Sequence, residues 1–158
     1  MKPYENPALS PEERATDLLS RMSLEEKWGQ VGCYFYAHDE LDIGAAHGAG
    51  QASTLEFRAL DTPEDAARMQ REVQEQIMAS SEHHIPAVFH MEGLNGALVQ
   101  DAVSFPEAIG RASSFDPELE ERIAGVVSRQ ELTLGITQIF APVLDINRDP
   151  RMGRLSET

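Results

Sequence analysis

Apolar side chains recur at helical spacing in three stretches of the chain, and each stretch follows a helix-capping sequence. In the first, Ser10 and Glu13 flank Pro11, so the serine hydroxyl and the glutamate carboxylate are placed to cap a first helical turn. The apolar residues that then share one face are Ala15, Leu18, Leu19 and Met22. This spacing predicts a helix that begins at Pro11.

Further helices are predicted in the same way. Residues 23–26 repeat the capping box and open a short helix that ends near Gln30. The clearest helix runs from Thr62 to about Ser80, and its apolar positions are Ala66, Met69, Val73 and Ile77. Another begins at Asp116 and ends near Gly135, with one side formed by Leu119, Ile123, Val126 and Val127. A short helical piece is expected within residues 104–112.

Continuous apolar runs between these helices predict strands over residues 31–36 and 87–91, and a strand that runs into a loop over residues 137–145. Residues 38–53 are rich in Gly, Ala and His and are expected to form a loop with a short strand. Helices and strands in alternation are typical of an α/β fold with parallel strands. Ligands bind such folds at the carboxyl ends of the strands, where the polar clusters of residues 90–96 and 145–154 are expected.

Length and charge limit the classes of function. The 158 residues are 41% apolar, enough for one globular domain, whereas a complete (β/α)8 barrel needs about 250 residues. The 27 acidic and 13 basic residues give a net charge of −14, which disfavours binding to nucleic acid or to anionic membranes. There is no apolar run long enough to span a membrane and no apolar leader at the start, so we expect a cytoplasmic protein.

Each candidate metal-binding motif in the sequence lacks residues that the motif requires. His90 and Glu92 resemble half of a deaminase zinc motif, but the Cys-x-x-Cys half is absent because Cys33 is the only cysteine. Residues 145–149 resemble the start of a calcium loop, which then lacks its glycine and its final glutamate. The pair of histidines at 83–84 is expected at a polar helix end. We therefore expect no metal and no cofactor.

Two polar clusters remain as candidates for binding. Glu92 follows a predicted buried strand in a glycine-containing turn, where it either accepts hydrogen bonds from ligand hydroxyls or pairs with an arginine. Residues 148–154, "RDPRMGR", hold three arginines whose guanidinium groups suit carboxylates and sugar hydroxyls. We expect Arg148 and Arg151 to pair with the nearby acids Asp145, Asp149 and Glu157. Arg154, at the far tip after a glycine, is the better candidate for a ligand.

Together these stretches resemble glycoside hydrolase family 3. The resemblance rests on "IPAVFHMEGLNG", "SFPEAIGRASSFDPEL" and, most specifically, "FAPVLDINRDPRMGR", and it covers nearly the whole chain. It implies a (β/α)8-like barrel followed by an α/β sandwich domain, and retaining, exo-acting hydrolysis of β-linked glycosides. It also implies that Glu92 and Arg154 hold sugar hydroxyls in the substrate site. The family's nucleophile, acid/base and Lys-His pair have no match in these residues.

The resemblance gives an expectation for the whole chain. Residues 1–158 are expected to be the N-terminal part of the family's N-terminal domain, a partial barrel truncated before the nucleophile and inactive alone. A β-glucosidase is expected, with a β-xylosidase or a non-enzymatic carbohydrate-binding fragment as alternatives. Asn95, Met152 and Glu92 stand where many relatives carry His, Trp and Asp, which leaves the sugar open. The partners would be a β-linked glycoside and the missing part of the polypeptide. Open strand edges predict self-association.

Overall fold

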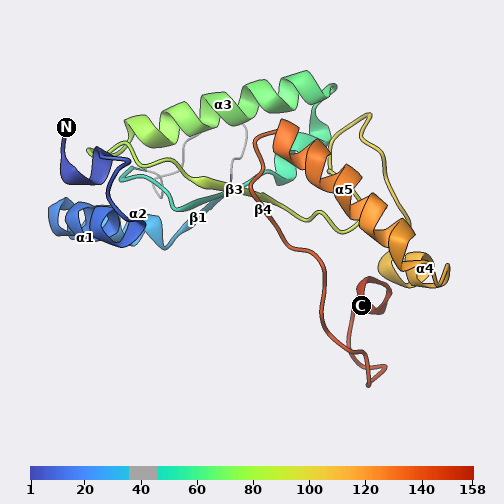
Figure 1. Cartoon of the computed structure of the whole chain (residues 1–158). Helices are drawn as coiled ribbons and strands as arrows, with labels where there is room; N and C mark the ends of the chain where they lie inside the picture. The colour runs from blue at the N-terminus through green and yellow to red at the C-terminus, as the bar shows by residue number, and fades with distance from the viewer. Residues whose placement is uncertain (36–45) are drawn as a thin grey trace.

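The computed structural model describes residues 1–35 and 46–158 (Figure 1). Its helices are α1 (Pro11–Arg21), α2 (Leu24–Gln30), α3 (Pro63–Ala79), α4 (Ala108–Ala112) and α5 (Pro117–Thr133). Its strands are β1 (Cys33–Phe35), β2 (Gln51–Ser53), β3 (Val88–Met91) and β4 (Gln138–Ile139). Short 3-10 helices are η1 (Pro3–Glu5), η3 (Leu55–Ala59) and η4 (Leu155–Glu157). No helix in these ranges is long and apolar enough to cross a membrane.

The four strands form one parallel sheet in the order β1-β2-β3-β4. In register, Ser53 lies beside Phe35 on one side and beside His90 on the other, and His90 lies beside Gln138. Neighbouring parallel strands follow one another along the chain, and the long helices α3 and α5 connect three of them. The predicted α/β class with parallel strands is therefore confirmed, and the sheet is a part of a barrel wall.

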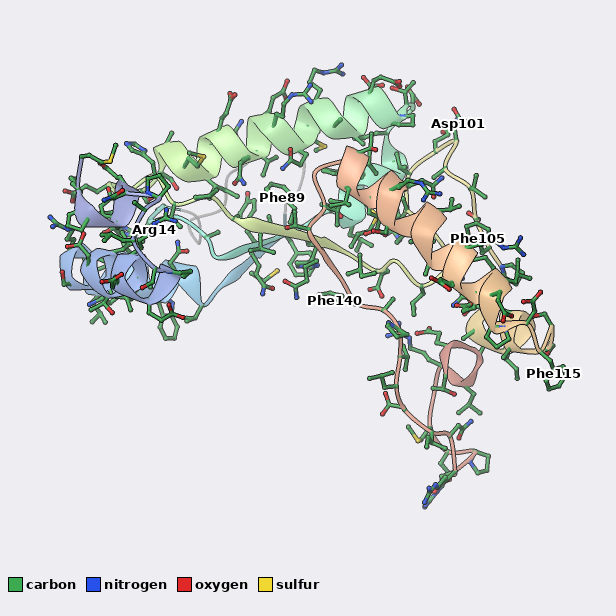
Figure 2. All side chains as sticks on the ribbon, in the orientation of Figure 1. Arg14, Phe89, Asp101, Phe105, Phe115 and Phe140 are labelled. Atoms are coloured by element: carbon green, nitrogen blue, oxygen red, sulfur yellow. The ribbon has the colours of Figure 1, made fainter. Side chains whose placement is uncertain are left out.

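The two long helices cover one face of this sheet. Helices α3 and α5 lie on the same side of the sheet in Figure 1, and Figure 2 places Phe89 on that side. The strand residues buried there are Tyr34, Ala52, Phe89 and Met91, and they meet Ala66, Val73 and Ile77 of α3 in one core. Alternate residues face the other way. Several of these, such as Phe35 and Val88, are exposed.

The helix starts follow the predicted capping. The backbone N–H of Glu13 donates to Ser10 Oγ (3.2 Å), and the backbone N–H of Ser10 donates to Glu13 Oε2 (2.9 Å). Ser23 and Glu26 make the same reciprocal pair at α2. At α5 the N–H of Leu119 donates to Asp116 Oδ1. Each cap satisfies N–H groups that a first helical turn leaves without partners.

The segment over residues 137–145, predicted to be a strand that runs into a loop, contains only a short strand. Only Gln138–Ile139 pairs, because β3 ends at Met91 and the N–H of Phe140 donates to Met91 O as the last bond of the ladder. The chain then leaves the sheet as an extended arm and returns to end beside α4 (Figure 1). The strand predicted over 31–36 is shorter, and residue 36 and the first half of the predicted loop over 38–53 lie outside the described residues. The short strand expected in that loop is β2.

Candidate functional site

Glu92 lies directly after β3, at the carboxyl end of the sheet. It is half-buried and lines a cavity of about 100 Å³ together with Ser53, His90 and two aromatic residues, Phe35 and Phe140. Figure 2 shows Phe140 where the chain leaves the sheet. The cavity therefore joins strand ends that are far apart in sequence, as expected for a binding site in a parallel α/β fold.

Two glycines shape the turn that carries Glu92. Gly93 and Gly96 have φ of +66° and +129°, which side chains of other residues disfavour. A Cβ at Gly96 would lie 2.4 Å from the carbonyl oxygen of Val103. The turn thus depends on glycine both for its backbone conformation and for space.

The same turn is tied to α4 and α5 by polar contacts. Asn95 Nδ2 donates to Glu107 Oε1 (3.0 Å), and Arg111 donates to the carbonyl oxygen of Leu94 (2.6 Å). Arg111 also pairs with Glu120 of α5 (3.1 Å). Asn95, which stands where many family members have His, is therefore an anchor of the loop that follows Glu92.

His90 lines the cavity, and Cys33 lies beside the His90 ring. The Cys33 Sγ and His90 Nε2 atoms lie 3.1 Å apart, and the His90 ring lies 4.6 Å from the ring of Phe140. Burial lowers the pKa of His90, although the charge of Glu92 acts in the opposite direction. Partial burial raises the pKa of the Cys33 thiol. Both shifts favour neutral side chains, so this pair does not hold an activated thiolate nucleophile. Sequence analysis had not paired these two residues.

Arg154 lies on the returning arm, with a left-handed backbone (φ +58°) and an exposed side chain. Its Nε donates to Glu157 Oε1 at 2.6 Å. This hydrogen bond is the main reason that the pKa of Arg154 is raised, and the charges of Glu92 and Glu107 add to it. Arg154 therefore lies in the electrostatic field of Glu92, although no hydrogen bond or ion pair joins these two described residues.

The ion pairs predicted for the loop of residues 148–154 are partly confirmed and partly wrong. Arg151 pairs with Asp149, as predicted. Glu157, however, pairs with Arg154 and not with Arg148 or Arg151, because η4 places residues 154 and 157 one turn apart. The candidate sugar-binding arginine is itself held by a carboxylate.

The buried pair of Glu26 and His83 was also missed by sequence analysis. Both residues are buried, and His83 Nδ1 lies 3.0 Å from each carboxylate oxygen of Glu26. Burial would raise the pKa of Glu26, but the hydrogen bonds from His83 and from the Ser23 backbone outweigh it and leave the pKa lowered. The pair links α2 to the segment before β3. His83 is therefore part of the interior and not a polar helix end.

Comparisons with known proteins agree with this geometry. The sequence model of the glycosyl hydrolase family 3 N terminal domain matches residues 23–158. The chain is 32% identical to the periplasmic beta-glucosidase of Salmonella typhimurium, over 98% of this chain and 20% of that protein. It is 29% identical to the periplasmic beta-glucosidase/beta-xylosidase of Dickeya chrysanthemi, over 100% of this chain and 27% of that protein.

A solved structure is similar as well. The β-glucosidase from Erythrobacter marinus superposes with a TM-score of 0.84 at 31% identity, over 98% of this chain and 21% of that one. The chain thus spans between a fifth and about a quarter of the length of these relatives. Since the family's sequence model covers most of the chain and the fold agrees, the chain belongs to glycosyl hydrolase family 3.

Proposed function

We propose that this chain supplies one wall of the sugar site of a retaining, exo-acting β-glycosidase, with a β-glucoside as the substrate. The proposal rests on one observation above the others: Glu92 lines a cavity at the carboxyl ends of the strands, together with His90 and the aromatic rings of Phe35 and Phe140. The relatives named above as β-glucosidases support the choice of reaction. A β-xyloside is the alternative substrate.

The two residues have complementary roles in this proposal. A carboxylate such as Glu92 only accepts hydrogen bonds, and it would take them from sugar hydroxyl groups. The Arg154 guanidinium only donates, and it would approach the same sugar from the returning arm. Sugar binding then competes with Glu157 for the Arg154 Nε donor.

The reacting groups are proposed to come from another part of the polypeptide. Retaining hydrolysis needs two carboxyl groups about 5–5.5 Å apart, one to attack the anomeric carbon and one to protonate the leaving oxygen. Glu92 is assigned to hydroxyl binding, and most other carboxylates in the described ranges lie on helix surfaces or caps. We therefore propose that the 158 residues alone bind sugar without cleaving it.

The test uses the protein as its host makes it. Hydrolysis of aryl β-glucosides and β-xylosides is measured for the parent protein, for Glu92→Gln, and for the control Glu121→Gln on the exposed surface of α5. Losing a charged hydrogen-bond acceptor should lower kcat/KM by about ten- to a hundredfold in Glu92→Gln only. Equal kinetics for Glu92→Gln and the parent would remove this assignment. Sugar binding without hydrolysis in the parent would favour a non-enzymatic binding protein.

A further inference from the structure

The carboxyl group of Glu131 is buried beneath the turn that carries Glu92. Glu131 lies in the last turns of α5 and is 1% exposed. Neither of its carboxyl oxygens has a hydrogen-bond partner among the described residues. An ionised carboxylate in such a place is costly, and burial accordingly raises the pKa of Glu131 to about 7.

The contact between Glu131 and the turn is made through Gly93, the residue after Glu92. A Cβ built on Gly93 would lie 3.1 Å from Glu131 Oε1 and 3.0 Å from Ile139 Cβ. No side chain therefore separates the Gly93 backbone from this carboxyl group. The Glu131 carboxyl group therefore packs against the backbone that sets the position of Glu92.

We propose that Glu131 is a positioning residue: its neutral carboxyl supports the Glu92 turn, and its ionisation displaces the turn and weakens sugar binding. The proposal rests on the proposed function of Glu92. A neutral carboxyl packs against Gly93 and Ile139 without a charge to solvate. An ionised one needs donors or water, and no described side chain donates to it. Opening the contact between α5 and the turn would admit water and move Glu92.

Burial alone raises the pKa of Glu131, because the described elements packed around it place no charged group beside its carboxyl. The strand β4 carries no titratable side chain, and the residues of α3 in the core are apolar. On β3 the titratable residue is His90, which lines the cavity with Glu92 on the opposite face of the sheet. No charge–charge interaction contributes to the raised pKa of Glu131.

The direction in which sugar affinity changes with pH follows from the linkage between sugar binding and the protonation of Glu131. Sugar binding should require the neutral form of Glu131, so this group leaves the affinity unchanged below about pH 7 and lowers it above, by up to about tenfold per pH unit. The reverse also holds, since a bound sugar should raise the pKa of Glu131. Glu131→Gln, which cannot ionise, should remove this pH dependence. Glu121→Gln on the exposed side of the same helix should keep it.

The first measurement follows the backbone amide NMR signals of Glu92 and Gly93 during a pH titration of the sugar-free protein. We expect both signals to shift with a midpoint near 7 in the parent and in Glu121→Gln, and not in Glu131→Gln. Signals that do not move near pH 7 in the parent would overturn the proposal. That result needs no variant, so it stands even if Glu131→Gln does not fold.

The second measurement determines the affinity for D-glucose across the same pH range by calorimetry. Binding that weakens above pH 7 in the parent and stays constant in Glu131→Gln supports the proposal. Equal pH profiles in the two proteins overturn it while leaving the sugar-binding role of Glu92 intact. Amide signals that titrate, with no glucose binding at any pH, would instead refute the proposed function and with it the link from Glu131 to sugar.

Discussion

Replacing Glu131 by Gln should change how the stability of the protein depends on pH. The pKa of this carboxyl is about 7 in the folded protein and 4.5 in its unperturbed state. Below 4.5 the group is neutral in both states and has no effect. As the pH rises from 4.5 to 7 the unfolded chain ionises first, so the folded state loses stability, and above 7 the loss is constant.

The size of this loss follows from the interval between the two pKa values. At about 1.4 kcal/mol for each pH unit, ionisation should cost roughly 3 kcal/mol of the free energy of unfolding by about pH 8. That is a large part of the stability of a typical domain. Carboxylates with lowered pKa, such as Asp17 and Glu26, have the opposite trend, but they are present in both proteins and cancel in the difference.

The assay is urea unfolding, followed by circular dichroism, at several pH values for the parent and for Glu131→Gln. The Gln amide is also buried without partners, so the variant is expected to be less stable than the parent near pH 4.5. With rising pH the parent should lose about 3 kcal/mol relative to the variant. If the free energies of unfolding of the two proteins differ by the same amount at every pH, the reasoning is refuted, whatever the size of that difference.

Two further predictions concern stability. His83→Ala leaves the Glu26 carboxylate buried without its partner, which should cost about 3 kcal/mol and lower the urea midpoint; an unchanged midpoint would show that the pair is not needed. Gly50→Ala places a Cβ 1.9 Å from the carbonyl oxygen of Gln30, where backbone must move, and should cost about 3 kcal/mol or more. Its control is Gly153→Ala, which meets no atom within 4 Å and should change the melting temperature little.

The helix starts could be predicted from sequence because a cap involves residues only three positions apart. Ser10 with Glu13 and Ser23 with Glu26 satisfy N–H groups whatever the rest of the chain does. The end of the last strand could not be predicted in this way. Its exact length depends on where β3 stops, and after Phe140 only Pro142, which has no N–H to donate, marks a limit.

In the candidate site, too, features set by local motifs could be predicted from sequence, and contacts between distant residues could not. The positions of Glu92 and Arg154 follow from local motifs, and their roles in binding remain predictions. The contact of Cys33 with His90 and that of Glu26 with His83 each join residues 57 positions apart, so only the fold reveals them. Glu131 had a signal in the sequence: it continues the four-residue spacing of Ile123 and Val127 on the buried side of α5. A glutamate on an apolar stripe is a candidate for a shifted pKa.

The charges around Arg154 also bear on which sugars the proposed site would admit. Three carboxylates, those of Glu92, Glu107 and Glu157, act on this one guanidinium, and the whole chain carries a net charge of −14. A uronic acid would bring a further carboxylate into this field and would meet repulsion that a neutral hexose or pentose does not. We therefore expect the negative charge around the proposed site to disfavour uronic acids relative to neutral sugars.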